Sequence, residues 1–294
     1  MKNKNNRKSI KFLSKTLKIK TAGKNTFFEN LGTVNSRNIN TLCYAENQIW
    51  LDEAISNDNI SIIITNCKIK KESSKGFIIS KNPKNLFYKI HNNLIKNSDF
   101  YGNNKKNIIS KSAEINSSCF IAEKNIIIKK NVVLGPNVCI YPNTTIEENV
   151  VIGANSVIGR DGFQNYRNND KLEFVKHAGS VKIGKNVNIG ANCSVDKGLF
   201  RDTTVIGDRT KIDSLVHIGH NVNIGKNCIM AGRVVVGGGS IIKNNSFIGL
   251  SACIKNGIVI GKNTVVGMGS VVIKNVNDSK IVAGNPAKIL KKIL

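Results

Sequence analysis

Four histidines are the side chains of this chain best suited to proton transfer near neutral pH, because unperturbed imidazole has a pKa of about 6.5. Two of them, His217 and His220, stand in the string HIGHN. His220 could act as a general base, and the carboxylate of Asp202 could orient its ring. On the residues alone an ordinary exposed histidine is the simpler interpretation. The rest of the sequence must therefore decide whether His220 is a general base.

These side chains must be positioned by a solenoid, because an aliphatic residue returns at every sixth position. The longest unbroken series is Ile206, Ile212, Ile218, Ile224, Met230, Val236, Ile242, Ile248, Ile254, Ile260, Val266 and Val272. Neither the helix period nor strand alternation gives this spacing, whereas three hexads close one coil of a parallel β-helix. We therefore predict a mainly β fold: a left-handed parallel β-helix of hexapeptide repeats over residues 106–280. A small α/β domain (1–105) precedes it, and a short C-terminal tail or helix (281–294) follows.

The phase of the repeat breaks twice, and each break predicts a loop. The first break lies between Ile158 and Ile183 and holds GRDGFQNYRNNDKLEFVKHAG. The second lies between Val195 and Ile206 and holds DKGLFRD. Loops that leave a rigid scaffold are where binding and catalytic residues usually gather, so both breaks are candidate site regions.

The residues before about position 105 lack the hexad period and alternate between strand and helix patterns. Segments 60–65 and 76–80 are typical of buried strands. In the string TLCYAENQIWLDEA, Tyr44 and Trp50 flank Asn47. Two aromatic rings and an amide could hold a flat base such as uracil, with plain core packing as the alternative.

Composition argues against several function classes. The formal net charge is +25, but Lys and Asn are spread along the chain without a basic cluster interleaved with aromatics, so we expect no nucleic-acid partner. Seven cysteines without a CxxC pair favour reduced thiols in a cytoplasmic protein and argue against a metal site. No apolar run approaches the ~18–20 residues of a transmembrane segment, and no signal peptide is expected.

The hexads, the preceding α/β domain and several local strings together resemble the UDP-3-O-acylglucosamine N-acyltransferases of lipid A biosynthesis. In that family two aromatics and an asparagine bind uridine, and the string from Tyr44 to Trp50 matches them. The segments 159–163 and 195–198 are similar to the family strings Gly-Ser-Asp-Gly-Phe and Ile-Asp-Arg-Gly. HIGHN is similar to the catalytic stretch, whose general base maps to His220.

The resemblance implies roles for individual residues. It makes His220 the catalytic base. Asp202 is expected as its partner from spacing alone, since it lies one coil earlier. The substrate-binding residues that it implies are Tyr44, Asn47, Trp50, Asp161, Phe163, Asp213 and His217.

Two departures from the family pattern concern the acyl donor. The second family histidine is matched by Gly257, so backbone N–H groups of Gly237–Gly239 are expected to stabilise an oxyanion. The C-terminus, with its Ala-Gly-Asn-Pro-Ala turn, resembles instead that of coenzyme A-dependent sugar acetyltransferases. The acyl-donor-binding residues expected from this are Gly237, Gly238, Gly267, Gly269, Gly284 and Asn285.

The resemblance implies acyl transfer from an acyl carrier protein or coenzyme A thioester to the 2-amino group of a UDP-glucosamine derivative. It also implies a homotrimer with no permanently bound cofactor. The alternative is a coenzyme A-dependent acetyl- or acyltransferase acting on an amino sugar of a surface polysaccharide. A non-catalytic solenoid that only binds a ligand is a weaker alternative. A zinc-dependent hexapeptide carbonic anhydrase would need three histidines on the metal, and His91 lies outside the repeats.

Overall fold

The chain divides into two compact units. The computed structural model describes residues 7–292 except 18, 70–72, 98 and 103. One unit covers the chain up to Gly102 together with Phe163–Ala178, and the other covers the remaining residues. The segment 163–178 therefore groups with the N-terminal unit, although it falls inside the range predicted for the solenoid.

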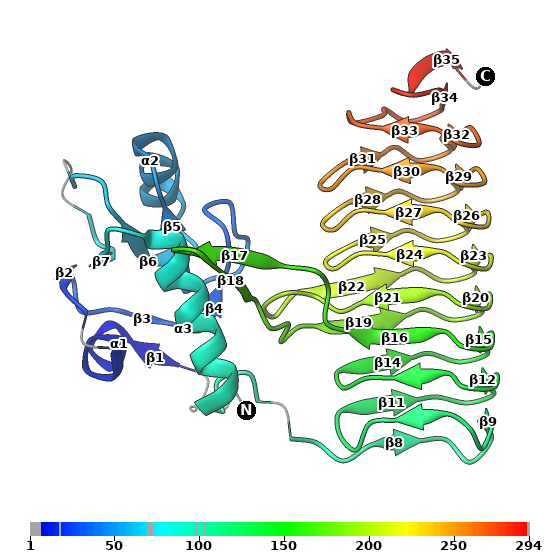
Figure 1. The fold of residues 1–294 in the computed structure, drawn as a ribbon, viewed down its shortest axis with the longest axis horizontal. Helices are drawn as coiled ribbons and strands as arrows, with labels where there is room; N and C mark the ends of the chain where they lie inside the picture. The colour runs from blue at the N-terminus through cyan, green and yellow to red at the C-terminus, as the bar shows by residue number, and fades with distance from the viewer. Residues whose placement is uncertain (1–6, 18, 70–72, 98, 103, 293–294) are drawn as a thin grey trace. The chain divides into compact units, whose positions relative to one another are not determined.

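The second unit is a parallel β-solenoid with three sheets, whose short strands stack coil upon coil (Figure 1). One sheet contains β10 (Phe120–Ile121), β13 (Cys139–Ile140), β16 (Val157–Arg160), β21 (Ser194–Asp196), β24 (His217–Ile218), β27 (Val235–Val236), β30 (Cys253–Ile254) and β33 (Val271–Val272). A second contains β8 (Ile108–Ile109), β11 (Ile126–Ile128), β14 (Thr144–Ile146), β19 (Ser180–Ile183), β22 (Thr203–Ile206), β25 (Asn223–Ile224), β28 (Ile241–Ile242) and β31 (Val259–Ile260). The third contains β9 (Glu114–Ile115), β12 (Val133–Leu134), β15 (Val151–Ile152), β20 (Asn188–Ile189), β23 (Lys211–Ile212), β26 (Ile229–Met230), β29 (Phe247–Ile248), β32 (Val265–Val266), β34 (Lys280–Ala283) and β35 (Lys288–Lys292).

The aliphatic residue of each hexad points inward, which confirms the predicted mainly β solenoid. Ile224, Ile242 and Ile260 stack in register on one sheet and are fully buried. β-branched side chains suit this pleated, buried surface. Small polar residues such as Ser246 also turn inward, and its hydroxyl donates to the carbonyl of Gly261 at 2.8 Å. Their hydroxyls satisfy buried carbonyls at the corners.

The corners of the coils use asparagine in the left-handed conformation. Asn227, Asn245 and Asn263 have φ angles of 56°, 60° and 55°. Their amides form a ladder in which each Nδ2 donates to the Oδ1 of the next asparagine at 3.1 Å. Asparagine tolerates this conformation better than other side chains with a Cβ, which accounts for its abundance in the repeat.

The C-terminal segment differs from the expected tail or helix. β34 continues the third sheet in parallel with β32, and β35 returns antiparallel to β34. A strand forms here because the edge of the last coil offers unpaired backbone groups to the chain that follows. The antiparallel return covers that edge.

The N-terminal unit is built on a five-stranded sheet in the order β2 (Thr21–Gly23), β7 (Gly76–Ile79), β6 (Ile60–Thr65), β5 (Thr41–Ala45) and β4 (Asn30–Leu31). Only β2 is antiparallel to its neighbour. The helices are α1 (Ile10–Leu17), α2 (Gln48–Ser56) and α3 (Pro83–Asn97), and β1 (Lys8–Ser9) pairs with β3 (Phe27–Phe28). Among the described helices, none is long and apolar enough to cross a membrane.

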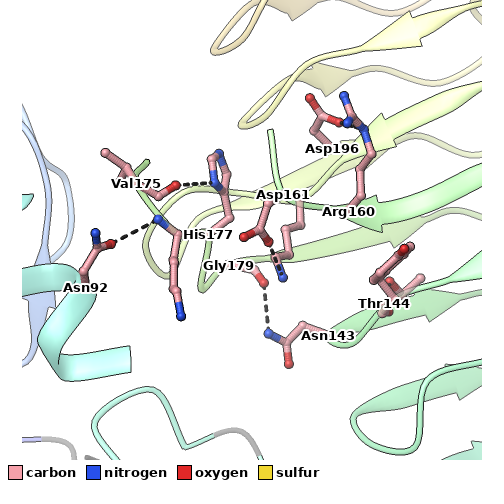
Figure 2. Close-up of polar contacts among 12 residues, drawn as sticks. Asn92, Asn143, Thr144, Arg160, Asp161, Val175, His177, Gly179 and Asp196 are labelled. Carbon is pink, nitrogen blue, oxygen red and sulfur yellow. Dashed lines mark hydrogen bonds and ion pairs between the residues drawn. The ribbon is translucent and has the colours of Figure 1, made fainter. Parts of the chain in front are cut away.

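The first predicted loop forms a β-hairpin. β17 (Asn165–Asn168) pairs antiparallel with β18 (Lys171–Phe174). The hairpin packs against α3 within the N-terminal unit: Asn92 Nδ2 donates to the Phe174 carbonyl at 2.9 Å, and Lys176 N donates to Asn92 Oδ1 at 3.0 Å. Figure 2 shows the second of these bonds. Because of these contacts with α3, the hairpin belongs to the N-terminal unit.

Candidate functional site

His220 lies at a corner of the solenoid, immediately after β24. Its Nδ1 lies 3.1 Å from Oδ1 of Asn221, and Asn221 has the left-handed φ of 60°. An amide oxygen can only accept, so Nδ1 carries the hydrogen. The neutral ring then has its lone pair on Nε2, the nitrogen that would accept a proton.

The side-chain amide of Asn221 is fixed in this orientation by two further hydrogen bonds, and a third holds its backbone. Its Nδ2 donates to Asp202 Oδ2 at 2.7 Å, and its Oδ1 accepts from Leu199 N at 2.8 Å. Its backbone N–H donates to Thr204 Oγ1 at 2.9 Å. Because a carboxylate accepts only, Nδ2 must face Asp202 and Oδ1 must face the imidazole of His220.

Asp202 is therefore connected to His220 through Asn221. Sequence reasoning named Asp202 as the orienting group and missed Asn221, since asparagine fills many solvent-facing corners of the repeat. Burial raises the pKa of Asp202, and the hydrogen bond from Asn221 opposes that rise. The string HIGHN was the only signal that could have selected this asparagine.

Gly238 lies against the ring of His220 one coil further along the chain. A Cβ at Gly238 would lie 2.7 Å from Nε2 and 2.9 Å from Cε1 of His220, so only glycine leaves room for the ring. Gly257 N donates to the Gly238 carbonyl at 3.0 Å. Gly257, which was matched to the second family histidine, is thus stacked one coil beyond Gly238.

Two of the three glycines expected to stabilise an oxyanion have paired backbone N–H groups. Gly237 N donates to the Ile254 carbonyl at 2.9 Å, and Gly239 N donates to the His220 carbonyl at 2.7 Å. Both N–H groups belong to the ladder that joins successive coils, and a donor already paired in this ladder has no second hydrogen to offer. The oxyanion role stays a prediction for Gly238.

A buried carboxylate lies beside His217 in the coil below. Asp196 is 2% exposed and its Oδ2 lies 3.7 Å from His217 Nε2. Its Oδ1 forms an ion pair with Arg160 Nε at 3.0 Å (Figure 2). The Nε–H of Arg160 donates to Ser194 Oγ at 3.1 Å. Burial raises the pKa of Asp196, and the charges of Arg160, His217 and His220 oppose that rise.

Asp161 follows Arg160 where β16 and β21 change register. Its Oδ1 forms an ion pair with Lys197 Nζ at 2.8 Å. Phe163, the last residue of the same predicted string, belongs to the N-terminal unit and its side chain is 88% exposed. The solenoid therefore brings Asp161, Arg160 and Asp196 to neighbouring strand ends, while Phe163 starts the hairpin segment.

Asp213 lies at the end of β23, and its Oδ1 accepts from Ser214 N at 2.7 Å. It borders a shallow hollow of about 310 Å³ whose other lining residues include Asn188, Lys211 and Ile229.

The remaining glycines of the expected donor path lie on the last coils. A Cβ at Gly267 would lie 2.8 Å from the Ala283 Cβ. Gly269 and Gly284 have φ angles of +64° and +101°, which favour glycine. Asn285 follows in the turn between β34 and β35. These positions give the end of the solenoid a backbone that is thinly covered by side chains.

In the N-terminal unit, Asn47 is the N-cap of α2. Its Oδ1 accepts from Trp50 N at 2.9 Å, so part of its amide has a structural role. The rings of Tyr44 and Trp50 are 6.4 Å apart at 76°, and Trp50 is 41% exposed. The pair forms an open angle rather than a closed stack, and the Nδ2 of Asn47 takes no part in the capping bond.

The other two histidines are structural. His91 is buried, with Nδ1 2.6 Å from the Tyr101 hydroxyl and Nε2 2.6 Å from the Lys176 carbonyl. His177 is buried, and its Nδ1 lies 3.1 Å from the Val175 carbonyl (Figure 2). Over the residues that the structure describes, no group of three or more His, Cys, Asp or Glu could hold a metal ion. All seven cysteines are free thiols.

Two family models match the solenoid. The bacterial transferase hexapeptide (six repeats) model matches residues 125–160 and 203–238. The model described as the hexapeptide repeat of succinyl-transferase matches residues 180–213 and 241–274. Both agree with the hexads read from the sequence.

Several curated relatives and one solved structure that match this chain are acyltransferases by name. The UDP-3-O-acylglucosamine N-acyltransferase of Rickettsia typhi is 43% identical over 128 residues, 44% of this chain and 37% of the relative. That of Rickettsia akari is 38% identical over 111 residues, 38% of this chain and 32% of the relative. The crystal structure of UDP-N-acetylglucosamine O-acyltransferase from Moraxella catarrhalis has 26% sequence identity to this chain and a TM-score of 0.43. The match covers 64% of this chain and 73% of the Moraxella chain.

The matched region spans about a fifth to two fifths of the length of these curated relatives. The predicted resemblance is confirmed within that range. This chain is a hexapeptide-repeat protein similar in sequence to the UDP-3-O-acylglucosamine N-acyltransferases.

Proposed function

We propose that this protein is an acyltransferase that moves an acyl group from a thioester to the 2-amino group of a UDP-glucosamine derivative, as in lipid A-type pathways. The observation that carries the proposal is the hydrogen-bonded series from Asp202 through Asn221 to His220, which sets the tautomer of a general base. The similarity to N-acyltransferases named for a UDP-acylglucosamine substrate supports the same conclusion.

In the proposed mechanism, His220 Nε2 takes a proton from the amine as the amine nitrogen attacks the thioester carbonyl carbon. The carbonyl π electrons move to oxygen and give a tetrahedral oxyanion. Collapse of the oxyanion breaks the C–S bond, and the imidazolium returns its proton to the leaving thiolate. The products are an amide and a free thiol, and no covalent enzyme intermediate or resident cofactor is required.

His217 and Asp196 provide a second polar pair near this chemistry. His217 Nε2 lies 3.7 Å from Asp196 Oδ2. Arg160 reaches the same carboxylate. We propose that this group binds a polar part of the amino sugar and does not remove the proton.

The uridine is proposed to bind at Tyr44, Asn47 and Trp50. A half-exposed tryptophan at an open angle to a tyrosine offers a face for a base, and Asn47 Nδ2 can donate to a uracil carbonyl. Replacing Trp50 with Ala should raise KM for the UDP-sugar by about tenfold and change kcat much less, because the uridine is remote from the bond being formed. Steady-state kinetics checks this, and an unchanged KM would contradict the nucleotide role.

We also propose a homotrimer with active sites between subunits. On the coils beyond His220, the exposed apolar side chains of Ile229 and Phe247 are paired on the neighbouring strands β26 and β29. Exposed apolar residues that recur on neighbouring strands are typical of protein interfaces. Light scattering of the purified protein at micromolar concentration tests this proposal, and an active monomer would overturn it.

The donor is proposed to be a thioester of acyl carrier protein or coenzyme A, and we propose a cytoplasmic location for the reaction. The deciding experiment compares turnover of one acyl chain on both carriers with a UDP-glucosamine derivative as acceptor. A preference for the carrier protein above about tenfold in kcat/KM would support the lipid A-type reaction. A clear preference for acetyl-coenzyme A would favour the alternative, a surface-polysaccharide acetyltransferase. If no thioester is turned over, the non-catalytic binding solenoid is the remaining alternative.

A further inference from the structure

The hairpin of β17 and β18 supports the aromatic cluster of the N-terminal unit. Tyr166 on β17 is 4% exposed, and its hydroxyl donates to Glu173 Oε2 on β18 at 2.6 Å. Asn168 Nδ2 donates to Glu173 Oε1 at 2.6 Å. These two bonds brace the hairpin internally, so the ring of Tyr166 is presented in a fixed orientation.

Tyr88 on α3 lies between this hairpin and the proposed base-binding residues. Its ring centroid is 5.3 Å from that of Tyr166 and 6.2 Å from that of Tyr44. Its hydroxyl accepts from Gln164 Nε2 at 3.5 Å. Tyr44 also packs against Phe87 at 5.1 Å.

The ring of Tyr44 is held by aromatic contacts from α3. Phe87 and Tyr88 pack against it at interplanar angles of 48° and 57°, whereas Trp50 meets it edge to face at 76°. Tyr88 contacts Tyr44 and Tyr166 at once, so it links the Tyr44 ring to the hairpin. Burial is the largest cause that raises the pKa of both Tyr44 and Tyr88, which keeps the two phenols neutral near pH 7.

We propose that the nucleotide-binding surface is built from two distant stretches of sequence, with Tyr88 and the hairpin residue Tyr166 acting as positioning residues for Tyr44. The inference rests on the proposed binding of a UDP-sugar at Tyr44 and Trp50. Neither Tyr88 nor Tyr166 contacts the base in this account. They hold the Tyr44 ring at the angle from which a uracil can lie against it, which lowers the ordering cost of binding.

The test uses calorimetry with UDP on the full-length protein. Tyr88→Ala removes the ring that links Tyr44 to the hairpin, so Kd for UDP should rise about fivefold, the effect expected for loss of one aromatic contact. KM for the UDP-sugar should rise in step while kcat stays unchanged. Tyr166→Ala removes the supporting ring from the hairpin side and should raise Kd at least as much.

Tyr101→Ala is the matched control, because it removes another buried ring of the same unit, one that contacts His91 and Phe100. It should lower Tm as much as Tyr88→Ala and leave Kd unchanged. Tyr88→Phe keeps the ring and should bind UDP like the wild type. The inference is overturned if Trp50→Ala weakens UDP binding while Tyr88→Ala and Tyr166→Ala bind like the wild type. It is also overturned if Tyr101→Ala raises Kd equally, which would indicate general destabilisation. A wild-type protein that binds no UDP overturns the nucleotide role itself.

Discussion

Two kinds of corner in the solenoid place asparagine in the same backbone conformation and use its side-chain amide differently. Asn227 and Asn245 share the left-handed φ of Asn221, yet their side chains bond only along the ladder of corners. The amide of Asn221 is turned instead toward Asp202 and His220. The ladder stabilises the rod, whereas the Asn221 corner orients a titratable ring.

The cause of the difference lies one coil below. There the hexad phase loses one residue between Val195 and Ile206, and the irregular segment brings Leu199 N and Asp202 to the amide of Asn221. Where the phase is kept, the next asparagine is the nearest partner. A departure from the repeat, rather than the repeat itself, thus produces the candidate site.

The largest expected effect comes from removing the ring that the Asn221 corner holds. His220→Ala should lower kcat by about 10²–10⁴, the usual range for loss of a general base, and leave the circular dichroism spectrum intact. His217→Ala should cost less, because its proposed role is to bind and not to transfer a proton. Steady-state kinetics on both variants checks the order, and a more damaging His217→Ala would reverse the assignment of the base.

Gly238→Ala should be the next largest change. Its added methyl group would displace the imidazole from a distance of 2.7 Å, and misplacing a catalytic group by about 1 Å can cost on the order of 10² in rate. Gly135→Ala is the control in a regular coil, where the nearest atom to the new Cβ is 3.1 Å away. The control should alter Tm and not kcat. Equal kcat values for the two variants would separate Gly238 from the chemistry.

The smallest effect concerns stability and distinguishes the two kinds of corner. The folded-state pKa of Asp202 is raised by burial, so its contribution to stability is present below its unfolded pKa of about 3.9 and is lost as pH rises through the folded value. Asp202→Asn, which keeps an oxygen acceptor, should therefore match or exceed the wild-type Tm at pH 7.5, by up to about 3 °C. The difference should disappear near pH 4. A lower Tm at pH 7.5 would mean that the carboxylate stabilises the fold.

The repeat made the solenoid predictable, because one inward aliphatic residue in six fixes both the strand and the coil. It did not predict to which of the two units the hairpin belongs, since the contacts of Tyr166 and Asn92 with their neighbours join segments about 80 residues apart. His220 and Asp202 could be named from their types and spacing. Asn221 could not, because its sequence position is that of any corner asparagine.

The comparison of the two corners is tested most directly by kcat for Asn221→Ala beside Asn245→Ala. Both variants place alanine at the same left-handed φ and remove one corner amide. Asn221→Ala should lower kcat by about 10–10² with little change in KM, because the ring of His220 loses its orienting acceptor. Asn245→Ala should lower Tm and keep kcat within about twofold. Equal kcat values for the two variants would contradict the account.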